Sequence, residues 1–173
     1  MQESGTPSVA ERKKKVLLLG ATGTIGRATT KELISAGYLV RCLVRQDDQL
    51  PQLEGAEIVL GDVTSVASLE MDGFGRGDFD VLVSCLASRS GEPDDAWAID
   101  AKANQSAFKL AKEHGVKHIV YLSAICVQKP RLAFQHAKLA AEASLIEGGV
   151  DYTIVRPTDF FKSLSDQIAR VQK

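Results

Sequence analysis

Three glycines, each separated from the next by two residues, constrain the fold of this chain more than any other feature. They lie in the stretch VLLLGATGTIGRATTKEL (16–33) and are Gly20, Gly23 and Gly26. The apolar run before Gly20 is typical of a buried strand, and a helix with Ile25 and Leu33 as apolar anchors follows. A glycine-rich turn between a buried strand and a helix is typical of a site for the diphosphate of a dinucleotide.

Each glycine has a separate predicted purpose in this turn. We expect Gly20 to permit the tight bend, Gly23 to let a diphosphate approach the backbone, and Gly26 to let the helix pack closely on the strand. The helix start then offers unpaired N–H groups to the phosphates. The residues between the glycines are predicted to bind the dinucleotide with them: Thr22, Thr24 and Ile25.

The rest of the chain alternates strand-like and helix-like segments. Strands are expected at 16–20, 38–44, 57–61, 79–87, 117–124 and 151–157, and helices at 25–36, 65–71, 94–114, 132–147 and 159–171. The pattern predicts an α/β fold: a Rossmann-like, doubly wound parallel sheet of about six strands with helices on both faces. Gly73, Gly75 and Gly77 are interpreted as a flexible connector.

Length and composition favour one globular domain with no special partner surface. We expect 1–14 to be a disordered basic tail and 15–173 to be the dinucleotide-binding domain, in a chain of 173 residues. The formal net charge of −1 predicts no binding of nucleic acid. No stretch approaches the roughly 20 apolar residues that span a bilayer. Neither the three cysteines nor the three histidines have metal-ligand spacing, so no metal site is predicted.

The end of the second predicted strand indicates which dinucleotide binds. An acid there would hold the ribose 2′-hydroxyl of NAD, whereas an arginine suits the 2′-phosphate of NADP. Arg45 lies at this strand end and Arg27 flanks it from the first helix, while Asp47 and Asp48 lie beyond the strand. NADPH is therefore the predicted cofactor.

Two further strand ends are expected to contact the cofactor. Asp62 can accept from the adenine amino group while Val63 covers the ring; alternatively, Asp62 caps the short helix that begins near Ser65. Leu86 and Ala87 end the fourth strand and bring small or apolar groups to the same edge.

The fifth strand is followed by a helix that carries the segment FQHAK. Ser123 lies at the strand end, and Phe134 and Lys138 share a helix face because they are four residues apart. In reductases that act on carbonyls, a tyrosine is expected where Phe134 stands. A tyrosine acid donates a proton to oxygen, so its absence disfavours carbonyl or quinone reduction.

Together, GATGTIG, the strand-end serine and the helical lysine resemble an atypical or extended short-chain dehydrogenase/reductase. Three longer stretches resemble the NADPH-dependent divinyl chlorophyllide 8-vinyl reductases of chlorophyll and bacteriochlorophyll biosynthesis. They are CLASRSG (85–91), LSAICVQKPRLAFQHAKL (122–139) and YTIVRPTDFFKSL (152–164). Members of that family are longer than this chain, which is expected to lack the C-terminal substrate part.

The resemblance implies hydride transfer from NADPH to the C8 vinyl group of a magnesium tetrapyrrole. It implies that Lys138 holds the nicotinamide ribose, that Ser123 occupies the place of the catalytic serine, and that Pro157 and Thr158 border the nicotinamide ring. Apolar surface for the flat substrate is expected from Phe134, Phe160 and Phe161.

Vinyl reduction explains why the lysine can persist without the tyrosine. Hydride addition to a vinyl group makes no alkoxide, so an acid aimed at oxygen has no target. Two alternatives remain: Phe134 is simply helix core in a fold that has lost catalysis, or the chain is a non-catalytic NADP(H)-binding redox sensor. The first eleven residues make a poor secretory or transit signal, which favours the cytoplasm of a photosynthetic bacterium over a chloroplast.

Overall fold

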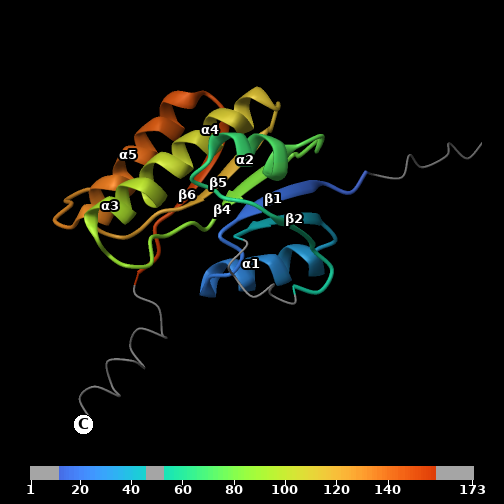
Figure 1. Ribbon diagram of the computed structural model, residues 1–173, viewed down its shortest axis with the longest axis horizontal. Helices are drawn as coiled ribbons and strands as arrows, with labels where there is room; N and C mark the ends of the chain where they lie inside the picture. Colours follow the sequence, from blue (N-terminus) through green and yellow to red (C-terminus); the bar gives the residue numbers. More distant parts are fainter. Residues whose placement is uncertain (1–11, 46–52, 159–173) are drawn as a thin grey trace, which may run out of the picture.

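The computed structural model describes residues 12–45 and 53–158, which form one parallel sheet flanked by helices (Figure 1). The strands are β1 (Lys15–Leu19), β2 (Leu39–Val44), β3 (Glu57–Leu60), β4 (Val81–Ser84), β5 (His118–Leu122) and β6 (Asp151–Val155). Their order in the sheet is β3-β2-β1-β4-β5-β6, and every neighbouring pair is parallel. This order confirms the predicted doubly wound, Rossmann-like fold.

The helical segments connect these strands. They are α1 (Thr24–Ser35), α2 (Val66–Ser68), η1 (Leu69–Phe74), α3 (Pro93–Ala96), η2 (Trp97–Ala103), α4 (Asn104–Glu113) and α5 (Ala133–Gly148), where η marks wide, π-helical turns. None of the helices in the described ranges is long and apolar enough to cross a membrane.

The sheet has a separate apolar core on each face, as strand alternation requires. Leu17 and Leu19 of β1 belong to the core under η1, α4 and α5, whereas Val16 and Leu18 belong to the core that α1 covers. Figure 1 shows α1 on one side of the sheet and α4 and α5 on the other. The strand order reverses between β1 and β4, and ligands of such sheets bind outside the carboxyl ends at that reversal.

Two local expectations from the sequence were wrong. The strand predicted at 79–87 is shorter: β4 begins at Val81 and ends at Ser84, although the N–H of Cys85 still donates to the carbonyl of Leu19 at 2.9 Å. The glycine connector does not begin at Gly73, which is buried inside η1. A Cβ atom there would make an ordinary contact with Leu43 at 3.4 Å, which places this turn against the sheet.

The predicted helix at 94–114 forms, but its middle is widened. Through its amide, Asn104 donates hydrogen bonds to the carbonyls of Ile99 and Asp100, both at 3.1 Å. These contacts satisfy carbonyl groups at the wide turn η2, which brings Asp100 into the interior. Residues 1–11 of the expected tail, the expected helix at 159–171, and Phe160 and Phe161 lie outside the described residues.

Candidate functional site

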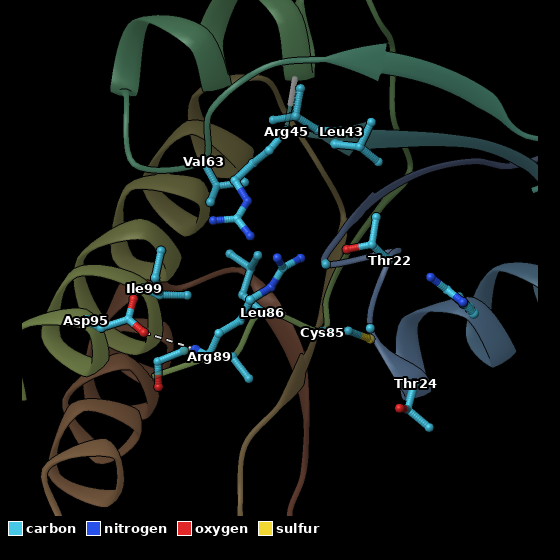
Figure 2. Close-up of a pocket in the computed structure, with 16 residues that line it drawn as sticks. Thr22, Thr24, Leu43, Arg45, Val63, Cys85, Leu86, Arg89, Asp95 and Ile99 are labelled. Carbon is cyan, nitrogen blue, oxygen red and sulfur yellow. Dashed lines mark hydrogen bonds between the residues drawn. The ribbon is translucent and has the colours of Figure 1, made fainter. Parts of the chain in front are cut away.

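A cavity of about 590 Å³ opens at the carboxyl ends of the central strands (Figure 2). This size lies in the range of small-molecule sites. Its lining comes from the glycine turn and α1, the end of β2, the residue after Asp62, the loop after β4, and the α3–η2 segment: Gly20, Thr22, Gly23, Thr24, Arg27, Leu43, Val44, Arg45, Val63, Cys85, Leu86, Ala87, Ser88, Arg89, Asp95 and Ile99.

Two of the three motif glycines are required by the fold itself. Gly20 has φ +78°, and a Cβ atom on it would lie 2.6 Å from the carbonyl carbon of Cys85. A Cβ atom on Gly26 would lie 2.0 Å from the carbonyl oxygen of Gly20. Any side chain at either position therefore meets backbone that cannot move aside without disturbing the β1–α1 turn.

Gly23 differs from the other two because the protein leaves it free space. It has an ordinary extended conformation (φ −73°, ψ 167°), and the nearest atom to an added Cβ is the Gly20 oxygen at 3.5 Å. Gly23 is also the N-cap of α1, which has no side-chain cap and no acid in its first turn. The helix start thus retains N–H groups and positive potential facing the cavity, which suits an anionic group such as a diphosphate.

Of the residues predicted to bind the cofactor, about half line the cavity. Those that do are Gly20, Thr22, Gly23, Thr24, Arg45, Val63, Leu86 and Ala87. Those that do not are Ile25, Gly26, Asp62, Lys138, Pro157 and Thr158. Ser123, which was predicted as a catalytic residue, does not line the cavity either. The cavity therefore covers the glycine turn and the β2 and β4 ends, while the residues expected beside the nicotinamide lie outside it.

Six lining residues were not singled out from the sequence: Leu43, Val44, Ser88, Arg89, Asp95 and Ile99. The signal that could have found Ser88 and Arg89 is the distinctive stretch CLASRSG (85–91), which continues past the end of β4 and carries a cation. Cys85 also lines the cavity, and burial raises its pKa, which keeps the thiol protonated.

Asp62 stabilises the turn after β3. Its carboxylate accepts hydrogen bonds from the backbone N–H and the hydroxyl of Thr64, both at 2.8 Å. The N-cap of α2 is Ser65 rather than Asp62, because the Ser65 hydroxyl accepts from the N–H of Ser68. Contact between Asp62 and adenine stays a prediction.

Lys138 lies behind the cavity wall, close to three oxygen atoms. Its Nζ is 3.2 Å from the carbonyl oxygen of Leu86 and 3.1 Å from that of Leu122, and it forms an ion pair with Asp100 at 3.1 Å. The two carbonyl contacts are hydrogen bonds, whereas the contact with Oδ1 of Asp100 is an ion pair without hydrogen-bond geometry. Contact between Lys138 and a ribose hydroxyl stays a prediction.

Asp100 is the buried counterion that sequence reasoning missed. It is 0% exposed and its partner Lys138 is 5% exposed, so the pair is isolated from water. The other carboxylate oxygen of Asp100 accepts from the N–H of Ser88 at 3.2 Å. Asp100 therefore joins the loop after β4, which lines the cavity, to the lysine of α5.

A second ion pair joins the buried Glu142 of α5 to Arg156, an exposed residue just after β6. Glu142 is 1% exposed and binds Arg156 through both carboxylate oxygens. Ser123 is also buried, and its hydroxyl makes no hydrogen bond among the described residues. The N–H of Ile125 donates to the carbonyl of Pro157 at 3.0 Å, which holds the segment after β6 beside the loop after β5.

Phe134 occupies a packing position. The ring is half-buried and packs against a small cluster formed by Ala96, Ala101 and Ala137. This placement fits the helix-core interpretation, while substrate contact by its exposed part stays a prediction.

Comparison with known proteins identifies the family. The NAD(P)H-binding family matches residues 20–172, and the chain belongs to it. Its cofactor is therefore a nicotinamide dinucleotide. Among solved structures, the Bordetella bronchiseptica enzyme WbmH, determined in complex with NAD+, has the same fold, with a TM-score of 0.76 at 19% identity over 94% of this chain and 64% of that one.

More specific relatives confirm the resemblance seen in the sequence. Divinyl chlorophyllide a 8-vinyl-reductase, chloroplastic, of Arabidopsis thaliana is 43% identical over 96% of this chain and 45% of its own length. The protein of the same name from Cucumis sativus is 42% identical over 91% of this chain and 41% of its own length. The chain thus spans less than half the length of these relatives.

Proposed function

We propose that this chain is the NADPH-binding part of a divinyl chlorophyllide 8-vinyl reductase, which reduces the C8 vinyl group of divinyl chlorophyllide or protochlorophyllide to ethyl in chlorophyll or bacteriochlorophyll biosynthesis. The observation that carries the proposal is 43% identity to such a reductase over 96% of the chain. The cavity beside the glycine turn supports it, because the helix start, Arg27 and Arg45 provide positive charge for a phosphorylated dinucleotide.

In such a reaction, the residues of this chain would bind the cofactor and support the wall of its cavity. When bound, NADPH supplies the hydride. The glycine turn and the arginines hold its phosphates, and the Asp100–Lys138 pair fixes the wall behind Leu86. Phe134 cannot donate a proton, which fits a reaction whose proton ends on carbon rather than on oxygen.

We also propose a chloroplast location in place of the bacterial cytoplasm expected from the sequence. Both relatives compared above are named as chloroplastic proteins. Fractionation of source cells with an antibody to this chain would test the location. Recovery with the plastid stroma or membranes is expected, and recovery only outside plastids would contradict the proposal.

A turnover assay tests the proposed reaction. The complete product of the gene is mixed with NADPH and divinyl chlorophyllide a, and the pigment is identified by chromatography and mass spectrometry. Gain of two hydrogen atoms at the C8 substituent, matched by NADPH oxidation, is expected. Binding of NADPH without oxidation in the presence of pigment would contradict it and favour the redox-sensor alternative.

A further inference from the structure

Positive side chains enter the cavity from more than one wall. Among the described residues, the charged ones that line it are Arg27, Arg45, Arg89 and Asp95. Arg27 lies in the first turn of α1, where the helix start already favours the diphosphate. Arg45 and Arg89 line other walls of the cavity, so a further anionic group between these walls would lie close to both.

Arg89 enters the cavity from the loop after β4, opposite the end of β2. Figure 2 shows the side chains of Arg45 and Arg89 both extending into the space between these walls. A guanidinium offers a planar fork of donors that matches a phosphate, and two forks can bind one phosphate from two sides.

Asp95 fixes the loop that carries Arg89. One of its carboxylate oxygens accepts from the N–H groups of Arg89 and Ser90, both at 3.0 Å, and from the Ser90 hydroxyl at 2.8 Å. Three hydrogen bonds to one oxygen define the path of this loop, so Arg89 starts from a fixed backbone position.

The same carboxylate is close enough to Arg45 to be affected by its charge. The pKa of Asp95 is lowered chiefly by the N–H and hydroxyl of Ser90, with smaller contributions from the Arg89 N–H and from Arg45. Arg45 and the Arg89 loop therefore share one acidic neighbour at the rim of the cavity.

We propose that Arg89, together with Arg45, forms a two-sided site for the 2′-phosphate of NADPH, which makes Arg89 a specificity-determining residue. The proposal rests on the assignment of NADPH made above. It predicts that Arg89 discriminates between NADPH and NADH, since the two differ only by that phosphate. If Arg89 instead held the diphosphate, which both cofactors contain, it would not discriminate between NADPH and NADH.

The test measures binding, so it does not depend on turnover. Dissociation constants of this chain for NADPH, NADH and 2′,5′-ADP are determined by fluorescence and calorimetry for wild type, Arg89→Ala and Arg89→Lys. Arg76→Ala is the control, because Arg76 is exposed and does not line the cavity. Thermal melting verifies that each variant is folded.

Arg89→Ala is expected to weaken NADPH and 2′,5′-ADP binding about tenfold or more, as for loss of a hydrogen bond to a charged group, and to change NADH binding less than twofold. Arg89→Lys recovers part of the loss, and Arg76→Ala has no effect. Arg45→Ala combined with Arg89→Ala costs less than the product of the single effects, because both act on one phosphate.

Two results would overturn the inference while leaving the proposed reaction intact. Equal weakening of NADPH and NADH by Arg89→Ala would assign Arg89 to the diphosphate, and unchanged binding would remove it from the site. If wild type binds NADPH and NADH equally, both this inference and the NADPH assignment fall.

Discussion

At the scale of single residues, the three glycines of the turn have two different roles: two allow the protein to pack, and one leaves space for a ligand. Gly20 and Gly26 are required by the protein's own packing, because backbone atoms fill the space where their side chains would be. Gly23 faces open space in an ordinary conformation. The lack of a side chain at Gly23 therefore leaves room for an anionic ligand at the start of α1.

Packing at Gly26 predicts a large loss of stability for a single methyl group. Gly26→Ala places Cβ 2.0 Å from the Gly20 oxygen, and we expect the free energy of unfolding to fall by at least about 3 kcal/mol. Gly148→Ala is the matched control, because no atom lies within 4 Å of its added Cβ. Urea unfolding measures both; a loss at Gly26 no larger than at Gly148 would refute the packing assignment.

At the scale of elements, the ends of β4, β5 and α5 are joined by buried charges rather than by apolar contacts alone. Lys138 of α5 contacts the carbonyl groups of Leu86 and Leu122, and Asp100 of η2 neutralises it. This arrangement places one lysine behind the cavity wall and connects three elements through it.

Removing one partner of this pair leaves the other charge buried. Asp100→Ala is expected to lower the free energy of unfolding by about 3 kcal/mol or more. Adding Lys138→Met should restore part of that loss, because no uncompensated charge then remains. Lys102→Ala, an exposed change in the same turn, is the control. Equal, small losses for Asp100→Ala and Lys102→Ala in chemical denaturation would contradict the buried ion pair.

The Glu142–Arg156 pair predicts a dependence of stability on pH. Burial acts to raise the pKa of Glu142, but the hydrogen bonds and the charge of Arg156 outweigh it, and the charge of Lys138 adds to them. The pKa in the folded state is therefore below its ordinary value of 4.5. The folded state then binds fewer protons than the unfolded state as the pH falls through this range.

Glu142 consequently stabilises the fold above about pH 4.5, and this contribution is lost as the pH falls through the lower folded-state pKa. Glu142→Gln should be less stable than wild type at neutral pH, and the difference should shrink below pH 4.5. Urea unfolding of both proteins across this range measures the difference. A difference that is constant with pH would show that the carboxylate charge of Glu142 does not contribute.

At the scale of the whole molecule, the strand pattern and the glycine turn were sufficient to predict the fold. All six strands and the reversal beside β1 follow from β-branched runs that alternate with helical periods. The end of β4 was misplaced because the apolar residues after Ser84 continue the strand pattern while the chain already lines the cavity. The local residue pattern alone therefore does not locate the end of β4.

The site was predictable only in part, for a physical reason. Arg45 and the glycines are recognisable because their role depends on local spacing. Asp100 and Glu142 are charged residues on helices, and residues of these types usually lie at the surface, so the sequence alone predicts that both are exposed. Their burial depends on partners distant in sequence, Lys138 and Arg156, which only the folded chain brings to them.

The most direct test of the central claim uses Gly23, where stability and binding should respond in opposite directions. Aspartate is a favoured N-cap, so Gly23→Asp should leave the free energy of unfolding unchanged or slightly higher. The same carboxylate should repel a diphosphate at the start of α1 and weaken NADPH binding at least tenfold, with a smaller effect for the neutral Gly23→Asn. A stable Gly23→Asp protein that binds NADPH as tightly as wild type would contradict a dinucleotide site at this turn.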